Sequence, residues 1–183
     1  ERLRTAGIEV VSGGLVDTPE RGLETGAAFR RQGVDFLLCV MSTYALSSSV
    51  LPVVQRAGVP VVLVSLQPSA ALDYARATTF DQLEHDNQTS LPEVCYALRR
   101  AGIDVPGIVV GTLYDDAPAW QRVLDWCQVA NATVALRDAR IGVMGHVYEG
   151  MLDMNADATQ FDALFGMHCQ HIELDDLAMC VAE

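Results

Sequence analysis

Nearly continuous apolar runs alternate along the chain with segments whose apolar residues recur at helical spacing. Four such runs predict strands, at residues 8–11, 35–41, 59–65 and 108–111. The segments between and after them predict helices, at residues 18–32, 48–57, 90–101 and 117–129. Strands that are apolar throughout are typical of parallel sheets covered on both faces. The pattern therefore predicts an α/β fold, with a Rossmann-like or flavodoxin-like parallel sheet flanked by helices and right-handed crossovers.

The alternation begins again near residue 138. A strand is predicted at residues 140–144, then a helix at 158–165, a strand at 168–174 and a helix from Asp175. We therefore expect an N-terminal α/β domain over residues 1–137 and the start of a second, truncated α/β unit over residues 138–183. The first residues resemble the end of a helix, whereas a parallel α/β fold usually begins with a strand. We expect that the first strand is missing and that the chain is a piece of a longer protein.

The predicted helix at 90–101 follows a polar segment that could form a site. Ser90 and Glu93 have the spacing of a capping box, and Pro92 suits a first helical turn. These signals predict that the helix begins at Ser90 and that residues 87–89 form a loop before it. Unpaired backbone N–H groups gather at such a helix start, where polar ligands often bind. An ordinary capped loop is the alternative. Residues 67–86, the least regular part, predict a short helix or a functional loop.

Composition excludes some classes of function. The formal net charge of −12 argues against a nucleic-acid partner, which requires clustered basic residues. No apolar run approaches the roughly 20 residues that a membrane span needs, and the N-terminus has no leader-like pattern. The five cysteines form no C-x-x-C pair, which is typical of free thiols in a reducing compartment. We expect a soluble, cytoplasmic protein.

Few residues form a pattern that indicates chemistry. Tyr44 and His146 each follow a predicted strand, at the edge where α/β proteins bind ligands; exposed loop residues are the alternative. His168 and His171 lie three apart on a predicted strand, so they face opposite sides and cannot easily share a metal. No set of carboxylates and histidines is predicted to converge. We therefore expect no metal ligand and no catalytic residue on this segment.

Several stretches, taken in order, resemble one family. They are Ser42-Thr43-Tyr44 after a buried strand, Asn87-Gln88-Thr89, the stretch from Val109 to Asp115, and the Gly-rich stretch from Arg140 to Asp153. Together they are similar to the L-arabinose isomerase and L-fucose isomerase-like sugar ketol-isomerases. The similarity covers nearly the whole chain, with order and spacing kept.

The resemblance implies a partial enzyme. Members of that family have an N-terminal α/β domain, a central α/β domain and a β-rich C-terminal domain. They form trimers or hexamers with active sites between subunits. A divalent metal, usually manganese, is bound by Glu and His of the later domains. This chain would cover most of the first domain and the opening of the second, so the metal ligands would lie outside it.

The resemblance also implies roles for particular residues. Gln88 would be a substrate-side residue offered across a subunit interface, with Asn87 beside it. Tyr44 and Tyr148 would line the sugar pocket as aromatic walls. His146, which follows a predicted strand, is a further candidate for contact with the sugar. Arabinose isomerases have a His three residues after the matching Gln, where this chain has Leu91. A lost hydrogen-bond donor near a polyol should change which sugar binds, so a different pentose or a deoxyhexose is expected.

The implied reaction is aldose–ketose isomerisation, in which a Glu pair moves a proton between C1 and C2 while the metal polarises the carbonyl. We expect this segment to be inactive alone, supplying substrate-side and oligomer-interface residues for a small-molecule sugar. Two alternatives stay open. One is a non-enzymatic sugar-binding α/β module, and the other is an isomerase-fold scaffold that has lost catalysis and only associates.

Overall fold

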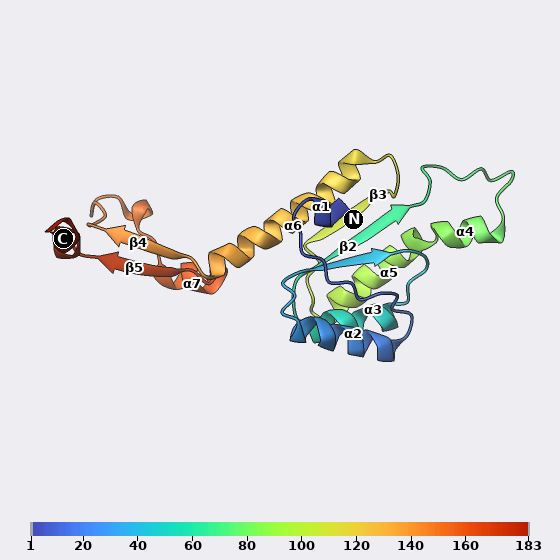
Figure 1. Ribbon diagram of the computed structural model, residues 1–183, viewed down its shortest axis with the longest axis horizontal. Coiled ribbons are helices and arrows are strands. Elements are labelled where there is room, and N and C mark those ends of the chain that lie inside the picture. Colours follow the sequence, from blue (N-terminus) through green and yellow to red (C-terminus); the bar gives the residue numbers. More distant parts are fainter. Residues whose placement is uncertain (1, 183) are drawn as a thin grey trace. The chain divides into compact units, whose positions relative to one another are not determined.

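A computed structural model describes residues 2–182. The chain divides into two compact units, one ending at Gln128 and the other beginning at Val129. The division falls inside the long helix α6 (Ala117–Arg137). Each unit has its own parallel sheet with helices packed against it (Figure 1). The predicted α/β fold of the Rossmann or flavodoxin kind is therefore confirmed.

The first unit is built on a three-stranded parallel sheet in the order β1-β2-β3. Its strands are β1 (Leu37–Met41), β2 (Val61–Gln67) and β3 (Gly107–Thr112). The central strand β2 is buried along nearly its whole length, which explains its continuous apolar sequence. All three strands run the same way, so their carboxyl ends lie at one edge of the sheet.

Helices cover both faces of this sheet. One face packs against α3 (Ser47–Ala57) and α5 (Asn87–Arg100), and its buried core includes Leu63, Val94 and Leu98. The other face packs against the first half of α6, with Val64 and Val109 buried beneath it. The short helix α1 (Arg2–Thr5) adds partly buried contacts on that side. Alternate residues of β2 thus point into two separate cores, as the twofold period of a strand requires.

A further helix, α2 (Pro19–Arg31), packs on α3 with unusually close backbones (Figure 1). Gly22 and Gly26 lie one turn apart on the contact face, and both are buried. A Cβ atom added at Gly22 would lie 2.4 Å from the carbonyl oxygen of Ser49, and one at Gly26 would lie 2.5 Å from that of Val53. Only glycine therefore permits this approach of the two helices.

Two predictions for the first unit are wrong, and one open alternative is decided. Residues 8–11 form no strand. In the described sheet β1 is an edge strand that pairs only with β2. The segment 67–86 contains a helix, α4 (Thr79–His85), which was one of the two expected possibilities. Helix α6 continues to Arg137 instead of ending near residue 129, since no glycine or proline interrupts it.

The second unit follows the predicted β–α–β order. Strand β4 (Arg140–Met144) pairs in parallel with β5 (His168–Ile172), and α7 (Ala158–Phe165) connects them after a short 3-10 turn (Leu152–Met154). A final helix, α8 (Leu174–Ala182), follows. The α7 bounds agree with the prediction, because Asp157 caps its start and Gly166, in the left-handed region, ends it.

Candidate functional site

The carboxyl-terminal edge of the first sheet gathers most polar side-chain contacts between elements. Strands β1, β2 and β3 end there at Met41, Gln67 and Thr112, and Gln67 pairs in register with Thr112. The start of α5, the end of α4 and the segment before α3 meet the same edge through the hydrogen bonds described below. Open α/β sheets bind ligands outside the carboxyl ends of their strands. We call this region the strand-end edge.

Asn87 joins three elements at the strand-end edge. Its side chain is fully buried, and its amide nitrogen donates to the carbonyl oxygens of Met41 and Leu66, each at 3.1 Å. Its side-chain oxygen accepts a hydrogen bond from Nε2 of Gln67. Both amide protons and the oxygen are therefore used. The Asn87 side chain ties the first residue of α5 to the ends of β1 and β2.

The helix that Asn87 opens begins earlier than predicted. Ser90 is fully buried inside α5 and donates to the carbonyl oxygen of Asn87 at 2.9 Å, so the predicted Ser90 capping box is wrong. Residues 87–89 belong to the helix and not to a loop before it. Pro92 then lies inside the helix, where it has no N–H to donate to the carbonyl of Gln88 four residues earlier. The buried contacts of Asn87 set the helix start.

The Glu93 side chain forms hydrogen bonds with residues before and in α3, and not with the start of its own helix. Its carboxylate accepts the Tyr44 hydroxyl at 2.5 Å and the backbone N–H of Ser47 at 3.0 Å. The residue before α3, Leu46, provides no side-chain cap, so Glu93 caps that helix from α5. The hydrogen bond from Tyr44, followed by those from Ser47, lowers the pKa of Glu93. The same Tyr44–Glu93 bond raises the pKa of Tyr44.

The sequence-predicted residues fall into two groups. Tyr44, Asn87 and Gln88 belong to the strand-end edge of the first unit, where Gln88 is exposed and the Tyr44 side chain is 43% exposed. His146 and Tyr148 belong to the second unit, where both are exposed in the segment after β4. Asn87 is turned inward, so Gln88 and Tyr44 are the members of the first group that solvent reaches.

Three further residues at this edge escaped the sequence analysis. Gln67 Nε2 donates to the carbonyl oxygen of His85 at 3.2 Å, and Ser69 Oγ lies 2.8 Å from His85 Nε2. The sequence analysis allowed a short helix in residues 67–86 but did not locate it. Thr78 and Asp81 form a reciprocal capping box at the start of α4, and their T-x-x-D spacing is a sequence signal that could have located this helix.

At the third strand end an aspartate organises the turn. Asp116 accepts the backbone N–H groups of Ala119 and Thr112, both at 2.9 Å. These hydrogen bonds, that of Ala119 first, lower the pKa of the Asp116 carboxyl. The carboxylate therefore serves as a cap for α6 and is engaged by backbone donors.

Residues 2–182 lack two features, a cluster of metal ligands and a helix that could cross a membrane. No group of three or more His, Cys, Asp or Glu in this range is placed to hold a metal ion. The residues described here therefore form no manganese site, and the family resemblance assigns those ligands to later domains. Within the same range, no helix is both long enough and apolar enough to cross a bilayer.

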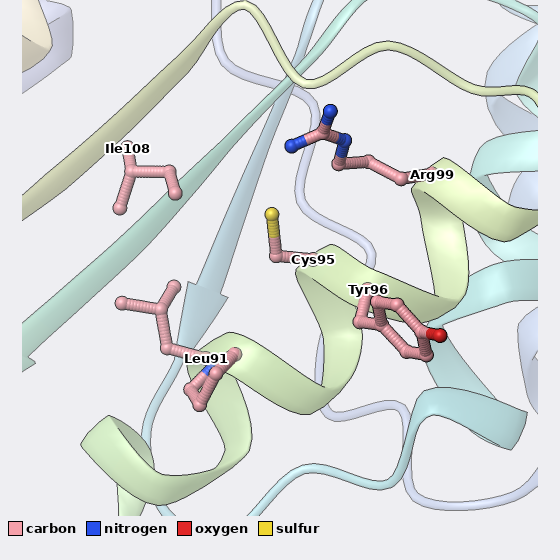
Figure 2. A pocket seen from close by; sticks show the side chains of 6 residues that line it. Leu91, Cys95, Tyr96, Arg99 and Ile108 are labelled. Atoms are coloured by element: carbon pink, nitrogen blue, oxygen red, sulfur yellow. The ribbon is translucent and has the colours of Figure 1, made fainter.

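A shallow apolar groove lies apart from these polar contacts, between α5 and the outer strand β3. Figure 2 shows its lining, and its volume is about 340 Å³. The lining residues are Leu91, Pro92, Cys95, Tyr96, Arg99 and Ile108. Leu91, which stands where arabinose isomerases have a histidine, is partly buried and packs against the core beneath α5. Its side chain therefore serves packing.

Comparison with known proteins identifies no relative. No protein-family model matches the chain, and no curated protein matches it. What the structure defines is the class of fold, a mixed α/β protein with parallel sheets flanked by helices.

Proposed function

We propose that this chain supplies the substrate-side wall of a sugar ketol-isomerase, which binds a pentose or deoxyhexose between subunits of a trimer or hexamer. The ordered resemblance in sequence supports this proposal, and one structural observation carries it. Asn87 is buried against the ends of β1 and β2, so its neighbour Gln88 is presented at the strand-end edge. A rigid strand end that displays an exposed amide suits recognition of hydroxyl groups.

Tyr44 would provide the apolar surface of this wall. Glu93 holds its hydroxyl, so the ring keeps a fixed place while 43% of the side chain is exposed. Sugars bind proteins through hydrogen bonds to their hydroxyls together with packing of their C–H faces on aromatic rings. On the family resemblance alone, we also propose His146 and Tyr148, in the second unit, as sugar contacts.

The proton transfer is not assigned to any residue described here. The carboxylates at the strand-end edge, Glu93, Asp81 and Asp116, are all engaged by hydrogen bonds within the protein. The acid–base pair and the divalent metal would come from later domains of the full-length protein. We also propose a cytoplasmic location, which free cysteines favour because disulfides are rare in reducing compartments. Residues 1–183 alone should show no conversion of any aldose to its ketose with manganese present.

The binding claim is tested by titrating the isotope-labelled chain with a panel of pentoses and deoxyhexoses. We expect weak, millimolar-order binding of at least one sugar, with chemical-shift changes in the Gln88 side-chain amide and the Tyr44 ring. Gln88→Ala should weaken that binding about tenfold or more, as expected for the loss of a hydrogen bond to a polar ligand. Gln55→Ala, at an exposed glutamine on α3, is the matched control and should bind as the wild type does. If no sugar in the panel moves these signals, the proposal is wrong.

A further inference from the structure

The strand-end edge holds a serine and a histidine in the geometry of an activated nucleophile. Ser69 follows the end of β2 by two residues, and His85 is the last residue of α4. Ser69 Oγ and His85 Nε2 are 2.8 Å apart. This distance lies within the range for a serine paired with its general base. The two residues are 16 apart in sequence, so the loop between them must close to bring them together.

A third group fixes which nitrogen of His85 is basic. His85 Nδ1 lies 2.7 Å from the backbone carbonyl oxygen of Asp81. A carbonyl oxygen only accepts hydrogen bonds, so in the neutral ring the proton sits on Nδ1. Nε2 then carries the lone pair, and it faces Ser69. This is the relation of nucleophile, base and orienting group found in covalent catalysis, with a carbonyl in the orienting role.

The histidine is anchored to the sheet as well as to its own helix. Gln67, the last residue of β2, donates from Nε2 to the His85 carbonyl oxygen and to the buried side chain of Asn87. The backbone that carries His85 is thereby fastened to the strand that leads into Ser69. Because both partners derive their positions from one strand end, their separation does not depend on the loop between them alone.

The serine hydroxyl has two acceptors of different chemistry. Besides His85, its Oγ lies 3.0 Å from the carbonyl oxygen of Ala71. An amide carbonyl can share the hydroxyl proton but cannot remove it at neutral pH, whereas an imidazole can. Ser69 is exposed, so an electrophile can approach its oxygen from solvent. His85 is therefore the group that would take the proton as the oxygen attacks.

We propose that Ser69 and His85 form a nucleophile–base pair that accepts the acyl group of a carboxylic ester. The Ser69 oxygen forms a bond to the ester carbonyl carbon, its proton passes to His85 Nε2, and the carbonyl electron pair moves to oxygen. Collapse breaks the bond to the alcohol, which leaves with the proton from His85. Water then releases the acid by the same route and restores Ser69. This inference does not rest on the proposed sugar site.

The test uses an alkyl fluorophosphonate, on which attack by Ser69 forms an O–P bond and expels fluoride. We expect one phosphonyl adduct on the whole chain, located by peptide mass spectrometry at Ser69. Ser69→Ala should abolish it. His85→Asn keeps a side-chain N–H for the Asp81 carbonyl but lacks the base, and should slow labelling at least about 100-fold, the usual contribution of a general base. Hydrolysis of 4-nitrophenyl acetate gives a second readout, which Ser69→Ala and His85→Asn should both lower.

The matched controls are Ser48→Ala, at an exposed serine on α3, and His171→Asn, at an exposed histidine on β5. Both should label at the wild-type rate, and circular dichroism should show that every variant is folded. An adduct on any other residue, an absent adduct, or wild-type labelling of folded His85→Asn would overturn the proposal. In the last case the Ser69–His85 hydrogen bond would only tether the loop.

Discussion

Replacing Asn87 should be the most damaging single change at the strand-end edge. The side chain is fully buried and takes part in three hydrogen bonds, two to strand carbonyls and one from Gln67. In Asn87→Ala the carbonyl oxygens of Met41 and Leu66 lose a partner in the interior. A buried polar group left unsatisfied costs about 1–3 kcal/mol. Gln67 is only partly buried and can turn to water. Counting the two carbonyls alone, we expect a loss of about 2–6 kcal/mol in the free energy of unfolding.

The loss can be measured by urea denaturation followed through tryptophan fluorescence. Trp120 and Trp126 both pack against the core of the first unit, so the signal reports on that unit. Gln88→Ala changes the exposed neighbour on the same helix and should alter stability by no more than about 0.5 kcal/mol. If Asn87→Ala and Gln88→Ala unfold at the same urea concentration, Asn87 does not hold the edge together and the reasoning fails.

Three further predictions concern packing and titration. Gly22→Ala would place a Cβ atom 2.4 Å from the Ser49 carbonyl oxygen, so thermal denaturation should show a loss of about 1–3 kcal/mol, whereas Glu24→Ala at an exposed position should not. Tyr44 should ionise above its ordinary pKa of 10.0 in a spectrophotometric titration, and Glu93→Gln should move that pKa back toward 10.0; no movement would contradict the hydrogen bond. The lowered pKa of Glu93 means that its ionised carboxylate stabilises the fold at pH values above the ordinary pKa of 4.5. This stabilisation is lost as the pH falls through the lowered pKa. Acid unfolding of Glu93→Gln should therefore depend less on pH below 4.5 than that of the wild type.

Periodicity and local caps accounted for much of the fold. Helix α7 has the predicted bounds because Asp157 caps its start and Gly166 ends it. Strand β4 also has the predicted bounds, and its residues alternate between exposed and partly buried. The three strands of the first sheet were predicted because each is a short apolar run, although only β2 is buried along nearly its whole length. In these elements the local signal and the tertiary environment favour the same structure, so sequence alone was sufficient.

The candidate site was harder to predict because its decisive contacts join distant parts of the chain. The Ser90–Glu93 spacing is a sound local signal, yet Glu93 is used by Tyr44 and Ser47, more than forty residues earlier. Asn87 was expected in a loop, but its bonds to two strand carbonyls draw it into the interior and start the helix there. Such pairings have no signature in local spacing.

The most direct test of the sugar-wall account is a crystal structure of this chain soaked with the sugar that binds it most tightly in solution. We predict sugar density at the carboxyl ends of β1 and β2, with a hydroxyl within hydrogen-bond distance of the Gln88 side-chain amide and a C–H face against the Tyr44 ring. Sugar bound elsewhere on the first unit, with Gln88 and Tyr44 facing only solvent, would contradict it.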